Sequence, residues 1–380
     1  MPTVTQKNEP LGTWIEIAGS PAYVAPAGPG ASAGLLLLPG DEEMADGTVA
    51  WYDRLARDGY CVIACGEKAV APAFDVLRRR LKEGAGIGAI ALGASAKSAV
   101  ALAEGGAIGA VVLHGLAPGM ASLVARCRCP VAVHLAAPDL SDGADLTALR
   151  ALVPNLTFLR LYEYPGCGAR FFDRLAAEFE PHAASLAHTR SLGTLRPAIG
   201  PHYDLARLLY AHLREEFVTH DADATMATMI DTPYVNHVPT LTGGVGHDML
   251  KRFYKYHFIP KLPEQRRNTY LSETVGADTV VLEFVTTFVH DTEIDYLLPG
   301  VAPTGKTVEI PTIVIAKFQG DKLYHEHIYW DQASILVQLG LLDPTGLPVA
   351  GVAEARKMLD QSLPANELMA KWAESADKPL

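Results

Sequence analysis

The chain has few cysteines and no excess of positive charge. Its 5 cysteines form a sparse, odd-numbered set, which does not suggest a disulfide framework, so we expect free thiols in the reducing cytoplasm. Lys and Arg number 32 against 43 Asp and Glu, giving a formal net charge of −11. This balance argues against nucleic acid as a partner, because phosphate binding needs clustered basic side chains. Small-molecule ligands are therefore expected.

Long apolar runs are also missing. None reaches the roughly 18 residues that a membrane-spanning helix needs, and residues 1–10 lack the basic start and apolar core of a signal peptide. We therefore expect a cytoplasmic protein that does not associate with membranes. With 380 residues, of which 49% are hydrophobic and 20% charged, the chain is long enough for two packed domains.

Short apolar runs alternate with amphipathic segments in the first half of the chain. Continuous apolar strands separated by helices are typical of a mostly parallel sheet covered on both faces. The pattern predicts an α/β domain over residues 1–190. The expected strands are 34–38, 60–65, 87–92, 108–113, 131–135 and 156–162, and the expected helices are 49–57, 74–82, 98–104 and 146–153.

The pattern changes after a segment rich in Gly and Pro, which predicts a linker over residues 191–204. Helices come first in the part that follows, and long strand-like runs come after them, which is typical of an α+β domain over residues 205–342. Residues 343–380 are expected to form a helical tail. The expected helices are 205–217, 222–229, 249–258, 352–361 and 367–372, and the expected antiparallel strands are 280–290, 308–318 and 323–330.

A candidate nucleophile follows the apolar run 87–92. The sequence there is Gly93-Ala94-Ser95-Ala96-Lys97, which has the strand, turn and helix context of a serine nucleophile elbow, although Lys97 replaces the second glycine of G-x-S-x-G. The acid of such a triad follows the serine in the chain, and Asp139 ends the run 130–139 where that acid should lie. Ser95 and Asp139 are therefore candidate catalytic residues.

Three stretches make residues 12–190 resemble the dienelactone hydrolases, which have the α/β-hydrolase fold. They are 93–98, 130–139 and 164–171, the last reading Tyr-Pro-Gly-Cys-Gly-Ala-Arg-Phe. The resemblance implies that Ser95 is the nucleophile and Asp139 the acid, but the family's histidine position holds Ala169. A serine without a base is a poor nucleophile. Either a base is recruited from elsewhere for ester or lactone hydrolysis, or the elbow is vestigial.

Residues 205–342 resemble the SnoaL-like polyketide cyclases, whose nuclear transport factor 2-like fold is a curved sheet wrapped with helices into a cone. The resemblance rests on Tyr-Val-Asn-His-Val-Pro at 234–239 and His-Ile-Tyr-Trp-Asp at 327–331. It implies that Asp331 faces the cone and does acid/base work on a ring closure. It also implies a homodimer, and no cofactor is expected.

Strand alternation independently predicts that several of these polar side chains lie together. It places His325, His327 and Tyr329 on one face together with Asp331, and such polar groups are costly to bury unpaired, so they suit a polar cavity. Asp331 would then act as general base or acid, and Asn236 and His237 would stabilise the negative charge on an enolate oxygen. The expected substrate contacts are Tyr234, His325, His327, Tyr329, Trp330 and His290.

Four alternatives stay open at this point. If the strand faces the other way, with Glu326 and Trp330 toward the cavity, Asp331 is a solvated strand end. His325 and His327 have the spacing of a metal pair, with His237 or His290 as third ligand, although no metal is expected. The sequence thus favours acid/base cyclisation, isomerisation or hydration of a polyketide-like or aromatic-derived substrate. A serine hydrolase or a non-catalytic binding or scaffold protein are the competitors.

Overall fold

The computed structural model describes residues 10–25, 30–40, 49–141 and 143–379. The chain divides into two compact domains, Met1–Tyr203 and Asp204–Leu380. Within the described residues, no helix has both the length and the apolar composition needed to cross a membrane.

The first domain is built on an eight-stranded sheet of order β1-β2-β4-β3-β5-β6-β7-β8. The strands from β4 to β8 in this order run parallel, and β1 and β2 add an antiparallel edge. This confirms the predicted α/β class, because the parallel strands are the continuous apolar runs. The strands are β1 Thr13–Ile17, β2 Ser20–Ala25, β3 Ala31–Leu38, β4 Cys61–Cys65, β5 Leu81–Leu92, β6 Ala110–His114, β7 Val131–Ala136 and β8 Leu159–Tyr164.

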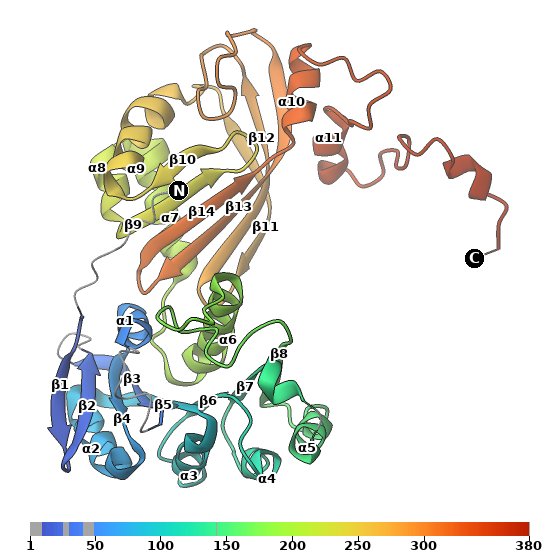
Figure 1. Ribbon diagram of the computed structural model, residues 1–380. Helices are drawn as coiled ribbons and strands as arrows, with labels where there is room; N and C mark the ends of the chain where they lie inside the picture. Colours follow the sequence, from blue (N-terminus) through green and yellow to red (C-terminus); the bar gives the residue numbers. More distant parts are fainter. Residues whose placement is uncertain (1–9, 26–29, 41–48, 142, 380) are drawn as a thin grey trace. The chain divides into compact units, whose positions relative to one another are not determined.

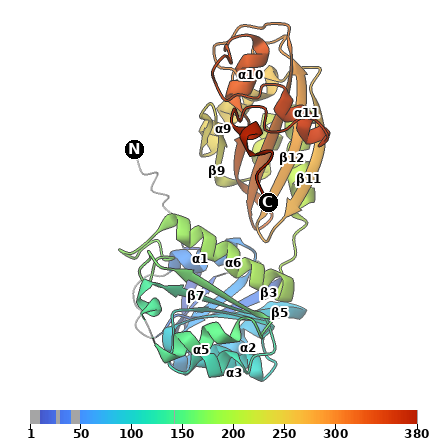
Figure 2. The same ribbon diagram turned by 90° about the vertical axis from the view of Figure 1, so that its right-hand side faces the viewer.

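Helices cover both faces of this sheet (Figure 1). Helices α1 and α6 lie on one face and the other four on the opposite face, as Figure 2 also shows. The buried apolar side chains between these layers form one continuous core. The helices are α1 Val49–Arg57, α2 Val70–Arg80, α3 Ala96–Glu104, α4 Met120–Val124, α5 Ala144–Leu152 and α6 Pro181–Ile199.

The predicted linker over residues 191–204 is too long, because α6 extends into it. Residues 191–199 are helical, although the sequence pattern assigned them to a connector because of Gly193 and Pro197. Pro197 removes one N–H donor from the helix, but it lies in the last turn, so the disruption is confined to the helix end. Burial of one helix face, including Leu192 and Leu195, outweighs the local preference of the glycine and the proline.

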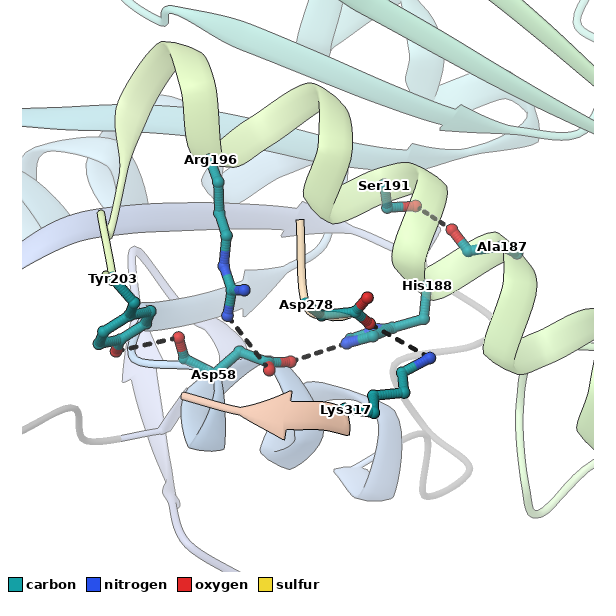
Figure 3. Close-up of polar contacts among 8 residues, drawn as sticks. All are labelled: Asp58, Ala187, His188, Ser191, Arg196, Tyr203, Asp278 and Lys317. Atoms are coloured by element: carbon teal, nitrogen blue, oxygen red, sulfur yellow. Dashed lines mark hydrogen bonds and ion pairs between the residues drawn. The ribbon is translucent and has the colours of Figure 1, made fainter. Parts of the chain in front are cut away.

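A buried polar network ties α6 to the turn after α1 (Figure 3). The carboxylate of Asp58 accepts from His188 Nε2 at 2.7 Å and lies 3.6 Å from Arg196 Nη2. The hydroxyl of Tyr203 donates to the Asp58 carbonyl oxygen at 3.3 Å. Asp58, His188 and Arg196 are all buried. One carboxylate therefore holds two side chains of α6 inside the first domain.

Replacing Asp58 by alanine should lower the free energy of unfolding of the first domain by about 3–5 kcal/mol, because removing one partner leaves buried charge without its counter-charge. The matched control is Glu163→Gln, which breaks the exposed Arg150–Glu163 pair and should cost at most about 1 kcal/mol. Hydrogen exchange of the β4 and β6 amides measures both. Equal losses in the two variants would contradict this account.

The second domain is built on a six-stranded sheet of order β10-β9-β14-β13-β12-β11. All neighbours are antiparallel except β14 and β9, which run parallel. Helices precede the long strands in the chain, so the predicted α+β class is confirmed. The strands are β9 Met229–His237, β10 Thr242–Val245, β11 Arg267–Val275, β12 Thr279–Val289, β13 Thr307–Gln319 and β14 Lys322–Tyr329.

Short helices complete the second domain. Two π-helical turns, Glu215–Thr219 and Tyr254–Phe258, continue α7 and α9. The predicted tail helix 352–361 is present as α11, but the predicted helix 367–372 is wrong. Residues 360–379 are exposed, and so short a helix is unstable without a packed face. The helices are α7 Leu205–Arg214, α8 Ala222–Ala227, α9 His247–Phe253, α10 Gln332–Leu339 and α11 Ala353–Leu359.

Candidate active site

The second domain contains a cavity of about 900 Å³ that is partly open to solvent. Its walls come from the end of α7, the two π-helical turns and the inner face of the sheet. Most of the lining is apolar and aromatic. The apolar lining includes Phe217, Phe258, Phe284, Phe288, Ile310, Ile328 and Trp330, and the polar lining is Glu216, His237, Tyr254, Arg266, Asn268, Tyr270, Thr286, Tyr296, Thr312 and Glu326.

Strand β14 presents the opposite face to the one that the sequence interpretation favoured. Glu326 and Trp330 line the cavity, while His325, His327 and Tyr329 do not. Alternation holds from His325 onward, so the residues that share a face are those predicted. The face that lines the cavity is the other one, which the sequence analysis left open as an alternative. The prediction that His325, His327 and Tyr329 face the cavity is therefore wrong.

Asp331 lies at the N-terminus of α10 and not in the cavity wall. Its carboxylate accepts from the Ala333 amide at 2.9 Å and from the Ser334 hydroxyl at 2.7 Å. These are the bonds of a helix N-cap, which satisfies amides that have no partner inside the helix. Asp331 therefore stabilises α10 in this arrangement, whichever chemistry the cavity supports.

Of the other predicted site residues, the cavity contains His237 and Trp330. Asn236 and Tyr234 alternate with inward-facing residues of β9 and lie on the outer face, where the Tyr234 ring packs 5.3 Å from the ring of His327. His290 is buried after β12, and its Nδ1 lies 3.2 Å from the Thr304 hydroxyl. Of these four residues, His237 and Trp330 therefore line the cavity, whereas Asn236 and Tyr234 do not.

A buried polar cluster at the cavity wall was not predicted. His212 Nε2 lies 3.0 Å from Glu216 Oε1 and 3.6 Å from Glu326 Oε2, and the side chain of Tyr254 is buried close to both carboxylates. His212 is 0% exposed, Glu216 3% and Glu326 4%. Part of this cluster could have been predicted from the sequence. His212 and Glu216 are four residues apart on the expected amphipathic helix 205–217, and this spacing places both on one face of the helix.

Hydrogen bonds fix the orientation of the His212 ring. Thr228 donates its hydroxyl proton to the Thr225 carbonyl oxygen at 2.6 Å, and the same hydroxyl lies 2.6 Å from His212 Nδ1. Because that proton is already used, the hydroxyl accepts from Nδ1–H. The other ring nitrogen, Nε2, lies on the side of the two carboxylates, within ion-pair distance of both.

The charges of this cluster follow from its surroundings. Burial by itself lowers the pKa of His212, but the Glu216 and Glu326 carboxylates outweigh it and raise that pKa to about 10. His212 is therefore a cation at neutral pH. Burial, reinforced by the same carboxylates, raises the pKa of Tyr254 well above its ordinary value, so its phenol keeps its proton. His237 differs, because burial lowers its pKa to about 4 and leaves it neutral.

His212, Glu216 and Glu326 could also hold a metal ion. One ligand atom from each lies within 4.8 Å of the others, and an imidazole with two carboxylates suits several divalent transition metals. A metal at Nε2 would replace the proton of the imidazolium. The histidine pair of the sequence interpretation lies elsewhere: the rings of His325 and His327 stack 4.7 Å apart on the outer face of the sheet.

In the first domain, Ser95 has the local geometry of an elbow without a base. It ends the 3₁₀ turn Gly93–Ser95 between β5 and α3, and it is 4% exposed. The Asp139 carboxylate accepts from the Leu116 and Ala136 amides at 2.8 and 2.9 Å. Over the described ranges, no histidine forms a hydrogen bond with Ser95 or with Asp139.

The buried histidines of this domain are engaged elsewhere. His188 binds Asp58, and His134 Nδ1 lies 3.0 Å from the Tyr164 hydroxyl while Nε2 lies 3.2 Å from Ser191 Oγ. The ring of His114 stacks on that of His134 at 4.7 Å, and burial lowers the pKa of His114 to about 3. Neither His188 nor His134 occupies the position of a base for Ser95.

A fluorophosphonate probe should therefore leave Ser95 unlabelled. The reaction needs a serine whose proton is removed by a neighbouring base, and the hydroxyl here is almost fully buried. Intact mass of the purified protein measures the labelling, with Ser95→Ala as the control. An adduct that forms on the wild type and is lost in Ser95→Ala would contradict this expectation and restore the hydrolase interpretation.

Comparisons with known proteins give only distant matches. No family model and no curated protein matches the chain. A putative polyketide cyclase from Acidithiobacillus ferrooxidans is 18% identical over 37% of this chain and 97% of its own, with a TM-score of 0.31. A putative SnoaL-like polyketide cyclase from Jannaschia sp. CCS1 is 14% identical over 38% and 99%, with a TM-score of 0.29. Neither reaches 25% identity or a TM-score of 0.5, so the chemistry is argued from the cavity's own residues.

Proposed function

We propose that the second domain is an acid/base enzyme that removes a proton from carbon next to a carbonyl group in a small, largely apolar substrate. The observation that carries this proposal is the pair of buried carboxylates, Glu216 and Glu326, that face an apolar cavity beside a cationic His212 and a neutral Tyr254. A carboxylate that is shielded from water is a stronger base than a solvated one.

The geometry assigns different roles to the two carboxylates. Glu216 is held closely by His212 at 3.0 Å, whereas Glu326 lies 3.6 Å away and is the less tightly paired. Glu326 is therefore the group that accepts the substrate proton. The His212 cation lies near both carboxylates and offsets part of the repulsion between them.

Tyr254 supplies the complementary hydrogen bond. Its phenol keeps its proton at neutral pH and lines the same cavity as Glu326. It can donate to the carbonyl oxygen as negative charge develops there, which stabilises the enolate more than the ground state. Return of the proton from Glu326 to another carbon gives isomerisation. Attack of the enolate carbon on an electrophile in the same molecule gives a ring.

The substrate class follows from the lining. Phe258, Phe284 and Trp330 present flat apolar surfaces that suit a ring system, such as a polyketide-like or aromatic-derived ketone. His237, which is neutral, remains available for hydrogen bonding in the cavity. In this proposal Asp331 and Asn236 take no part in proton transfer.

A deuterium-exchange assay tests the proposal and does not require the natural substrate to be known. Cyclic ketones and β-diketones are incubated with the protein in D₂O, and the loss of the C–H signals is followed by NMR. Enzyme-dependent exchange above the buffer rate is expected, and it should survive treatment with a chelator. Exchange that disappears with the chelator and returns with a divalent metal would replace this mechanism by the metal-bound one. Binding of these compounds without any exchange would favour a non-catalytic binding protein.

A further inference from the structure

Arg266 stands out among the charged side chains of the cavity. It precedes β11, lines the cavity and is half-buried. Glu216 and Glu326 share His212 as their counter-charge, but in the part of the chain that the structure describes Arg266 has no ion pair and no hydrogen bond. A cation thus lines an apolar cavity with its donors unused.

The guanidinium of Arg266 is nevertheless held in place. Its central carbon lies 3.9 Å from the centre of the Phe217 ring, a cation–π contact that fixes the group over one aromatic face. Such stacking engages the flat face of the guanidinium and leaves its N–H groups directed outward from its edges. Those edges form the planar fork that matches the two oxygens of a carboxylate.

A polar line across the sheet continues from this position. Asn268 also lines the cavity, and its Oδ1 accepts from the Thr286 hydroxyl at 3.1 Å. The Thr286 and Thr312 hydroxyls lie 3.3 Å apart. Because the Asn268 oxygen is the acceptor, its amide NH₂ group remains a donor. Arg266 and Asn268 therefore both offer donors, and neither offers a negative charge.

Arg266 lines the same cavity as Glu216 and Glu326. Burial raises the pKa of Tyr296 to about 12, with the Arg266 guanidinium opposing and the Glu216 carboxylate adding to that rise. Both charges thus lie near one phenol. A neutral ligand would leave the guanidinium without a bonded anion inside the cavity.

We propose that Arg266 makes this cavity selective for substrates that carry a carboxylate on an apolar ring body, with Asn268 as a second donor to that carboxylate. The inference rests on the proposed function for the identity of the reacting end, since Glu326 and Tyr254 act on the carbonyl side while Arg266 holds the acid group. Arg266 is a binding residue in this scheme and takes no part in proton transfer.

Binding of matched ligands to the full-length protein tests the inference. Isothermal titration compares 2-naphthoate with 2-naphthamide, which has the same ring and a neutral head. The wild type should bind the naphthoate at least about tenfold more tightly, the scale of one charge-assisted pair. Arg266→Gln should abolish this preference and leave naphthamide binding unchanged, which also shows that the cavity is intact. Arg252→Gln, at an exposed position of α9, is the control.

A second variant separates charge from geometry. Arg266→Lys keeps the charge but loses the planar fork, so it should retain only part of the naphthoate preference. Equal affinity of the wild type for the two ligands, absence of naphthoate binding, or equal effects of Arg266→Gln and Arg252→Gln would overturn the inference. If deuterium exchange fails while the Arg266-dependent preference persists, the proposed chemistry is wrong and the carboxylate site stands.

Discussion

Replacing Glu326 by glutamine should lower the rate of proton abstraction by about 10²–10⁴-fold, the usual contribution of a general base. Glutamine has the size of glutamate and keeps a hydrogen-bonding oxygen, but it does not accept a proton from carbon. The side chain is 4% exposed and lines the cavity, so bulk water has little access to replace it as a base. The rate constant for deuterium exchange of a bound ketone measures the effect, with ligand affinity measured in parallel.

Asp331→Asn is the decisive comparison. The sequence resemblance assigns the acid/base role to Asp331, whereas the structure has its carboxylate bonded to the Ala333 amide and the Ser334 hydroxyl. Asparagine is also a good N-cap, so this variant should fold and exchange deuterium at nearly the wild-type rate. Loss of exchange in Asp331→Asn with full exchange in Glu326→Gln would reverse the assignment of the base.

The difference between these two residues shows what a sequence pattern can and cannot specify. The apolar run of β14 predicts a strand, and the strand is there. Alternation predicts that His325, His327 and Tyr329 share one face, and they do. It does not say which face lines the cavity, because both faces carry polar and aromatic side chains. That choice depends on the packing of β14 near α7, which is distant in the chain.

The cluster of His212, Glu216 and Glu326 was also only partly predictable from the sequence. His212 and Glu216 are four residues apart, so their proximity follows from helix geometry. Glu326 joins them only because β14 packs near α7 in the folded domain, which no local pattern reveals. In the first domain, the apolar strands and the turn at Ser95 were predictable because they are local. The connection of α6 to Asp58 was not, because it depends on tertiary contacts.

Replacing His212 by glutamine should lower the free energy of unfolding of the second domain by about 3–5 kcal/mol near pH 6, because two buried carboxylates lose the cation between them. The loss should depend on pH in a defined direction. The folded-state pKa of His212 is raised from 6.5 to about 10, so its contribution is fully present below pH 6.5 and declines as the pH rises toward 10. Urea unfolding at pH 6, 8 and 10 measures it.

The wild type and His212→Gln should therefore differ most at pH 6 and least at pH 10, where the folded-state His212 also loses its proton and the unfolded histidine is already neutral. His247→Gln, at an exposed position with a weaker pair to Asp248 at 3.7 Å, is the control and should show no such trend. Adding Glu216→Gln to His212→Gln should recover part of the stability, because one of the two uncompensated charges is then removed. A constant difference between wild type and His212→Gln across this range would mean that His212 is neutral in the folded protein. Glu216 and Glu326 would then have no cation near them, and the arrangement on which the proposed role of Glu326 rests would be wrong.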